Sequence, residues 1–115
     1  MKDINTLLEK IKKFRDERDW MQFHNHKDMA ISLLLEAGEV LEHFQWKTAA
    51  EIEEYGQTHK NEIADELGDV LIYLAELADN LGIDLVDAAL QKIEKNEQKY
   101  PIEKAKGKYA KYTKL

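Results

Sequence analysis

The sequence predicts an all-α fold, and two observations carry that prediction. Apolar residues recur at helical spacing along most of the chain, and no useful stretch alternates apolar and polar residues as a half-buried strand would. The 115 residues include one proline and five glycines, so few residues break helices. A chain of this length has room for one hydrophobic core. We therefore expect a single domain over residues 1–115, resembling a four-helix bundle, with residues 101–115 as a basic tail.

The first helix is expected to begin at Ile4, with Asp3 as its N-cap, because apolar side chains then follow at intervals of three and four residues. A polar and aromatic connector without a clear period comes next. Large rings are uncommon in connectors unless they serve a purpose. The second helix is expected to begin within residues 25–29 and to run to about Trp46.

A break follows the second helix. Thr48 and Glu51 form the T-x-x-E pattern of a capping box, which predicts a short helix ending at Gly56. Thr58 is the expected N-cap of a third long helix that runs to about Asn80.

The last long helix lies between recognisable end signals. Gly82 stops the preceding helix, and Asp84 is the expected cap of a helix from Leu85 to about Tyr100. Pro101 ends that helix. The remaining residues have weak helical character.

Composition excludes several classes of protein. Cysteine is absent, so disulfides and thiolate metal sites are excluded, and no apolar run approaches the roughly 18 residues of a membrane span. The N-terminus lacks the apolar core of a signal peptide, so we expect a cytoplasmic protein without a membrane partner. The net charge of −6 argues against binding to a nucleic-acid polymer.

The charge is unevenly distributed. Residues 92–115 carry eight lysines against three glutamates, or +5, so the first 91 residues carry −11 of the total of −6. This basic end fits a small polyanion such as a triphosphate, and it fits a solvated tail equally well.

Two pairs of acids have the same sequence context. Glu36 and Glu39 lie in E-x-G-E-V-L, and Glu66 and Asp69 lie thirty residues later in E-x-G-D-V-L. On a helical wheel each pair falls at the edge of its helix's apolar face, with its two carboxylates one turn apart. We therefore expect four carboxylates to converge when the two helices pack side by side.

Four carboxylates in a partly buried pocket need protons or cations for compensation. Oxygen ligands of this kind suit Mg²⁺, or Mn²⁺, bound together with substrate phosphates. Gly38 and Gly68 lie between the acids, where we expect a backbone or a ligand to approach closely. The alternative is that these acids are ordinary surface residues. A di-iron carboxylate bundle is disfavoured, because no histidine follows a glutamate by three residues.

The acid pattern and five further stretches resemble a known family: ERDWMQFH, GEVLEHFQWK, DELGDVLIYL, NEQKYP and KYTKL. The chain is similar to the MazG-like all-α nucleoside triphosphate pyrophosphohydrolases, and within them to the dCTP pyrophosphatase branch. This resemblance implies hydrolysis of a nucleoside triphosphate to the monophosphate and pyrophosphate. It implies that Mg²⁺ is held by the four acids, with Glu36 or Glu39 as the general base.

The resemblance also implies a substrate site. Trp20, His24 and Trp46 match residues that line the base pocket, and Tyr73 is placed to touch the sugar. Phosphates are expected at Lys92 and Asn96, with Tyr100 one turn further on. Arginines that animal members carry nearby are replaced here by Glu97, Gln98 and Ala110.

The family resemblance further implies a homo-oligomer, a dimer or more specifically a tetramer, with sites lined by more than one subunit. The leading hypothesis is a pyrophosphatase acting on dCTP or a modified dCTP. The alternatives are a broader MazG-like enzyme acting on several triphosphates and a non-catalytic helical oligomer that binds nucleotide.

Overall fold

The computed structural model describes residues 2–115, and these residues confirm the all-α fold. The chain divides into two compact units, one ending at Gly82 and the other running from Ile83 to Leu115. The first unit holds α1 (Ile4–Glu17), a short 3₁₀ turn η1 (Met21–Phe23), α2 (His26–Glu42), α3 (Ala49–Thr58) and α4 (Lys60–Asn80). The second holds α5 (Leu85–Lys99), α6 (Ile102–Ala105) and a terminal 3₁₀ turn η2 (Tyr112–Lys114).

Most helix ends follow the predicted capping signals. The Asp3 side chain accepts a hydrogen bond from the backbone N–H of Thr6, which begins α1 at Ile4. Thr48 and Glu51 form the predicted capping box at the start of α3. Asp84 caps α5 in the same way as Asp3 caps α1.

Two predicted boundaries are wrong. The helix α2 ends at Glu42, four residues before Trp46, whose positive φ of 69° is incompatible with a continuing right-handed helix. Gly56 does not end α3, which continues to Thr58, so Thr58 is not the N-cap of α4. His59 separates the two helices, and its side chain makes no capping hydrogen bond.

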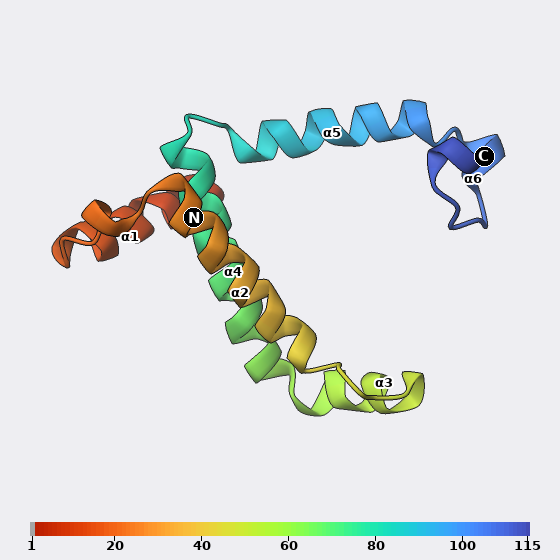
Figure 1. Ribbon diagram of the computed structural model, residues 1–115, viewed down its shortest axis with the longest axis horizontal. Helices are drawn as coiled ribbons and strands as arrows, with labels where there is room; N and C mark the ends of the chain where they lie inside the picture. Colours follow the sequence, from red (N-terminus) through yellow and green to blue (C-terminus); the bar gives the residue numbers. More distant parts are fainter. Residues whose placement is uncertain (1) are drawn as a thin grey trace. The chain divides into compact units, whose positions relative to one another are not determined.

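The helices α2 and α4 form the principal packing of the first unit and run alongside each other (Figure 1). His43 near the end of α2 contacts Glu66 near the start of α4, and His24 before α2 contacts Glu76 late in α4. These two contacts define an antiparallel pair. The antiparallel arrangement sets the middle of α2, with Glu36 and Glu39, opposite the part of α4 that carries Glu66 and Asp69.

A small core joins α1, α2 and α4. Its buried apolar side chains are Ile11, Met29, Ala75 and Ala78. The two alanines are among the smallest side chains, and small residues let neighbouring helices approach closely. Lys12 of α1 also pairs with Asp79 of α4 at 3.0 Å.

Much of the predicted apolar stripe on α2 and α4 stays exposed within the chain. Leu41 is 63% exposed, and Leu67 and Leu71 are also largely accessible. An exposed apolar area along two adjacent helices is typical of a surface that binds another protein. The periodicity predicted an apolar face on α2 and on α4, and a single chain leaves part of each face exposed.

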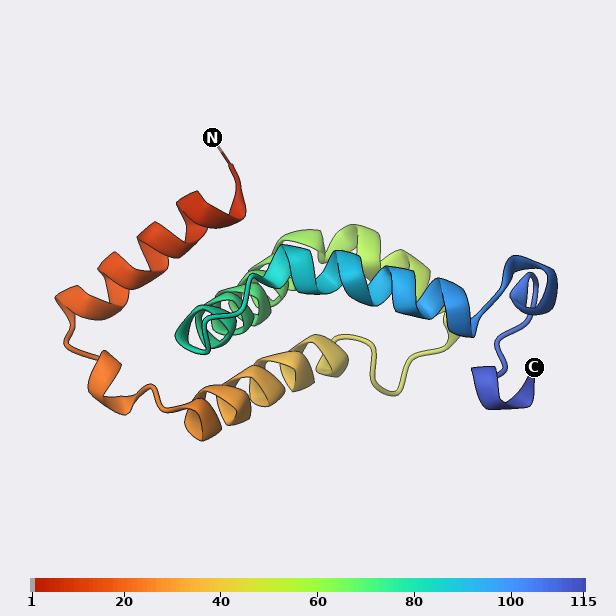
Figure 2. The ribbon, with the colours of Figure 1, turned by 90° about the horizontal axis from the view of Figure 1, so that it is seen from above.

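The helix α5 carries its own exposed apolar side chains, Val86, Leu90 and Ile93. They recur at intervals of three and four residues and so share one face of the helix. Figure 2 shows α5 as a long continuous helix. Among residues 2–115, no helix combines the length and apolar character needed to cross a bilayer.

Candidate functional site

The four predicted acids lie close enough to affect one another. The pKa of Glu36 is raised, first by burial, then by a hydrogen bond with Glu39 and by the negative charges of Glu39, Asp69 and Glu66. The acid pair of α2 and the acid pair of α4 are therefore near each other. The charges of the four acids interact in the folded chain, and their convergence on one metal ion stays a prediction.

One oxygen in this group has no compensation. Oε2 of Glu36 is buried and has no hydrogen-bond partner among the described residues. A buried polar atom without a partner costs free energy, and the cost is higher for an ionised carboxylate. The surrounding acids can only increase that cost. The position therefore favours a proton or a bound cation.

A series of side-chain contacts positions Glu66, and the sequence analysis did not predict them. Its Oε2 faces Nε2 of His43, and neither atom has another hydrogen-bond partner among residues 2–115. Nδ1 of His43 lies 2.7 Å from the hydroxyl of Tyr55 on α3. The His59 ring stacks on Tyr55 at 3.9 Å. With Nε2–H directed at the carboxylate, Nδ1 is the acceptor for the Tyr55 hydroxyl.

The acids as they lie do not surround one point. Within residues 2–115, no three acidic or histidine side chains are arranged to hold one metal ion in common. One of the four acids already has a partner, since Glu66 faces His43. The donor set still fits a hard cation: it consists of carboxylate oxygens, and the unpartnered Oε2 of Glu36 is a free ligand atom. Side-chain rearrangement would be required to bring the oxygens around Mg²⁺ or Mn²⁺.

The glycines between the acids do not mark a close contact. A Cβ added at Gly38 or at Gly68 would meet no atom within 4 Å. The expected approach of another backbone at these positions is therefore wrong within this chain. The space beside both acid pairs is open.

A cavity of about 460 Å³ lies between α1, η1 and α4. Four of the predicted site residues line it: Trp20, His24, Asp69 and Tyr73. Trp20 packs edge-on against Phe14, with ring centroids 5.7 Å apart. One wall of the cavity is thus aromatic, and Asp69 links it to the acid group. Its dimensions suit an organic ligand that stacks on a ring.

Tyr73 connects the acids to the rest of the cavity. Burial raises its pKa, and the negative charges of Glu36, Asp69 and Glu76 raise it further. The phenol is therefore neutral at physiological pH. Its hydroxyl can donate a hydrogen bond to a ligand oxygen in this cavity.

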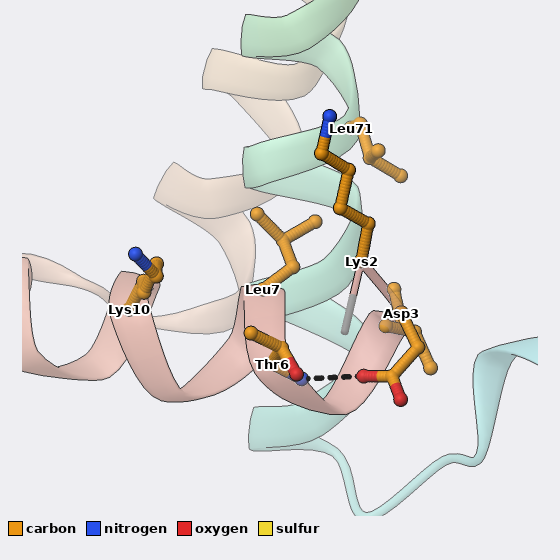
Figure 3. Close-up of a pocket in the computed structure, with 7 residues that line it drawn as sticks. Lys2, Asp3, Thr6, Leu7, Lys10 and Leu71 are labelled. Atoms are coloured by element: carbon orange, nitrogen blue, oxygen red, sulfur yellow. Dashed lines mark hydrogen bonds between the residues drawn. The ribbon is translucent and has the colours of Figure 1, made fainter.

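A larger cavity of about 750 Å³ lies beside the N-terminal turn of α1, and Figure 3 shows the side chains around it. Its lining combines Leu7, Leu71 and other apolar groups with Lys2 and Lys10. None of the predicted site residues lines it. Chemistry rather than volume therefore selects the smaller cavity as the candidate site.

Trp46 does not join this cavity. Its side chain is 92% exposed, and it follows the end of α2, the opposite end from His24. Within one described chain it packs on nothing that would make a base pocket. The prediction that Trp46 lines the same pocket as Trp20 and His24 is not met inside the first unit.

Lys92, Asn96 and Tyr100 lie in the second unit, on α5 and at its C-cap. The pKa of Lys92 is lowered, chiefly by the positive charge of Lys99, with further contributions from burial and from Lys95. Three lysines thus share one side of α5. Such a row suits a polyanion, and phosphate binding by Lys92 and Asn96 stays a prediction.

The most buried acid was not predicted. Glu76 is 3% exposed and contacts His24, Arg15 and Asn80. A signal for it exists in the sequence, because Asp69, Tyr73, Glu76 and Asn80 follow one another at intervals of four, three and four residues. They continue the acid-bearing edge of α4 toward its C-terminus.

The fold and the site define a class: an all-α protein with an E-x-x-E pair and an E-x-x-D pair on antiparallel helices, next to a cavity with aromatic walls. The MazG-like family model matches residues 31–115. The chain belongs to the MazG-like family.

Known proteins are similar over most of the chain. The proteins called dCTP pyrophosphatase 1 from Rattus norvegicus and Homo sapiens are each 42% identical over 104 residues, which is 89% of this chain and 61% of theirs. The chain thus spans about 61% of the length of these curated relatives. The crystal structure of a pyrophosphatase from Archaeoglobus fulgidus superposes with a TM-score of 0.82 at 42% identity, covering 84% of this chain and 91% of that one.

Proposed function

We propose that this chain hydrolyses a nucleoside triphosphate, dCTP or a modified dCTP, to the monophosphate and pyrophosphate in a reaction that needs Mg²⁺. The similarity to proteins called dCTP pyrophosphatase 1 and to an archaeal pyrophosphatase supports the reaction. The chain's own residues support it independently. A role in the nucleotide pool also agrees with the cytoplasmic location expected from the sequence.

One observation carries the proposal: the uncompensated, buried Oε2 of Glu36 stands among three further acids. Folding concentrates negative charge here without supplying a cation of its own. A bound Mg²⁺ or Mn²⁺ supplies positive charge for the phosphates and makes a water molecule more acidic. Glu36, Glu39, Glu66 and Asp69 are the residues proposed to hold it.

The carboxylates also account for proton transfer. Water attacks the α-phosphorus, the bond to the bridging oxygen breaks, and pyrophosphate leaves with the bonding electrons. The proton of the attacking water passes to Glu36 or Glu39. Both remain candidates for the general base. His43 and Tyr55 orient Glu66 and take no direct part in the step.

The proposed orientation of the nucleotide follows from the cavity. Asp69 and Tyr73 lie where the cavity meets the acids, so the phosphates belong at that end. Trp20 offers a flat face for the base, and His24 offers a ring nitrogen for its edge. Lys92 and Asn96 of α5, with Tyr100, are proposed to bind phosphate.

We also propose that the active form is a homo-oligomer, a dimer or a tetramer. The exposed Leu41, Leu67 and Trp46 support this, because a second copy would bury them. Trp46, which lacks a role within one chain, would then complete a base pocket with another subunit. Light scattering that shows a monomer at micromolar concentration would reject the assembly.

The decisive experiment is a pyrophosphate-release assay across the four deoxynucleoside and four ribonucleoside triphosphates, with Mg²⁺ or Mn²⁺. We expect dCTP or 5-substituted dCTP to give the highest kcat/KM. Similar rates for several bases would favour a broader MazG-like enzyme. Absence of turnover with every triphosphate would reject the enzymatic function and leave a nucleotide-binding oligomer.

A further inference from the structure

Glu76 is a buried carboxylate that the proposed hydrolysis does not use. It is 3% exposed, and its Oε2 accepts hydrogen bonds from Nδ1 of His24 at 2.7 Å and from Nδ2 of Asn80 at 3.2 Å. Nη1 of Arg15 lies 3.9 Å from the same oxygen. A single carboxylate oxygen therefore gathers three polar groups from α1, α4 and the segment before α2.

The surroundings keep Glu76 supplied with donors and positive charge. Arg15 is itself buried and also pairs with Asp16 at 2.8 Å. An arginine stays protonated at all physiological pH values, so a positive charge is always present beside the carboxylate. An ionised carboxylate can only accept hydrogen bonds. The group that faces it from His24 must therefore be an N–H.

This contact determines the chemistry of the other side of the His24 ring. When Nδ1 carries the proton, the neutral imidazole has its lone pair on Nε2, which becomes a hydrogen-bond acceptor. His24 lines the cavity with Trp20 and Tyr73, while its Nδ1 is occupied by Glu76. Nε2 is thus the ring nitrogen available to a ligand.

We propose that Glu76 is a positioning residue that holds His24 in its Nδ1–H form, so that Nε2 accepts a hydrogen bond from an exocyclic amino group of the bound base. Cytosine presents such an amino group where uracil presents a carbonyl oxygen. A lone pair on Nε2 favours the amino group and disfavours the carbonyl. Base selectivity would then be set by a carboxylate that never touches the substrate. The part of this inference that concerns the base rests on the proposed function.

The first test needs neither substrate nor a variant of Glu76. Long-range ¹H–¹⁵N NMR correlation spectra distinguish the two neutral forms of histidine and the charged form, and the His24 signals are assigned by their loss in His24→Asn. We expect His24 of the wild-type protein at pH 7.5 to be neutral and protonated on Nδ1. An Nε2–H form or a doubly protonated ring would overturn the proposal.

The second test removes the acceptor while keeping the volume. Glu76→Met should let His24 shift toward the Nε2–H form, and it should lower the ratio of kcat/KM for dCTP over dUTP by roughly tenfold, the effect of mismatching one buried hydrogen bond. The change should appear mainly in KM, because the acids that act on the phosphates are untouched. Glu76→Gln retains an oxygen that can accept from Nδ1–H, so it should restore most of the ratio.

Asp79→Asn is the matched control, since Asp79 lies one turn from Glu76 and pairs with Lys12 without contacting His24. It should leave the ratio and the NMR spectrum unchanged. A Glu76→Met protein that keeps both the wild-type ratio and the Nδ1–H form would overturn the proposal. If no triphosphate is turned over, the proposed function fails while the wild-type NMR result still decides the role of Glu76. The wild-type NMR result also decides the role of Glu76 if the Glu76→Met protein does not fold.

Discussion

Two glutamates of the first unit, Glu36 on α2 and Glu76 on α4, have opposite surroundings. Glu76 faces an arginine, a histidine and an asparagine, so the protein itself supplies its counter-charge and its donors. Glu36 faces three other acids, its pKa is raised, and its buried Oε2 has no hydrogen-bond partner among residues 2–115. The first arrangement is complete without a ligand, and the second is not.

The difference separates structural acids from acids that serve a ligand. A buried carboxylate with a full set of partners stabilises one arrangement of the chain, and its removal leaves those partners uncompensated. A buried carboxylate among like charges costs stability until a cation arrives. The two kinds of acid should therefore respond in opposite ways to substitution and to metal.

The largest expected effect is on activity at Glu36. Glu36→Gln removes an anionic ligand at nearly constant shape, so kcat/KM with Mg²⁺ should fall by roughly a hundredfold or more. Pyrophosphate release under saturating Mg²⁺ measures it. Glu42→Gln is the control, because Glu42 is an exposed acid on the same helix. Equal activity in the two variants would remove Glu36 from the proposed metal site.

The next effect is on stability at Glu76. Glu76→Ala removes the hydrogen-bond partner of His24 and a negative charge beside Arg15. It should lower the free energy of unfolding by about 2–4 kcal/mol, the Arg15–Asp16 pair moderating the loss. Urea denaturation of the metal-free protein measures it. Under the same conditions Glu36→Ala should be neutral or stabilising, since it relieves repulsion. Comparable destabilisation by both variants would contradict the distinction between the two acids.

A smaller effect is expected where a side chain orients a proposed ligand. His43→Asn takes away the contact to Glu66, and the loss of such an outer partner weakens metal affinity by about 10–100-fold. The Mg²⁺ concentration for half-maximal activity measures it. Tyr55→Phe removes only the hydroxyl that bonds Nδ1 of His43 and should give a weaker change in the same direction. A larger effect in Tyr55→Phe than in His43→Asn would be inconsistent with this chain of contacts.

The pH dependence of stability should give a further test of the assignment of Glu36. The folded pKa of Glu36 is raised above its ordinary value of 4.5, so the folded state binds its proton more tightly than the unfolded state. Stability of the metal-free protein should therefore fall as pH rises from about 4.5 through the raised pKa, and Mg²⁺ should restore it above that range. Thermal denaturation at several pH values, with Mg²⁺ and with EDTA, measures this. Glu36→Gln should abolish the Glu36 contribution, and an unaltered profile would contradict the assignment.

The sequence analysis singled out the four acids of the proposed metal site but not Glu76. The acid pairs are local patterns, because residues three apart on a helix lie one above the other whatever the rest of the chain does. Glu76 becomes special through Arg15 and His24, which lie 61 and 52 positions away in the sequence. The burial of its carboxylate follows from how α1 and the segment before α2 pack on α4. Helix periodicity places Glu76 on the acid-bearing edge of α4, but it carries no information about that packing.

Trp46 shows the same limit of sequence analysis for an exposed side chain. The family resemblance implied that Trp46 lines the base pocket, yet its side chain is 92% exposed in the chain. The exposed Leu41 and Leu67 belong to the same pair of helices. A sequence pattern marks residues to be buried without saying whether the same chain or a second copy buries them.

The smallest expected effect concerns Asp79, a partly exposed acid that pairs with Lys12. Asp79 pairs with Lys12 at 3.0 Å between α4 and α1, but both side chains are partly exposed to solvent. Asp79→Asn should therefore lower the free energy of unfolding by about 0.2–1 kcal/mol, and salt should reduce that loss, because water screens an exposed pair. Urea denaturation at low and at high salt measures it. A salt-independent loss as large as that of Glu76→Ala would mean that desolvation extends across the whole contact between α1 and α4. The contribution of Asp79 or Glu76 to stability would then depend on the whole contact between α1 and α4. The contrast with Glu36 would in that case be between two regions of the molecule and not between single residues.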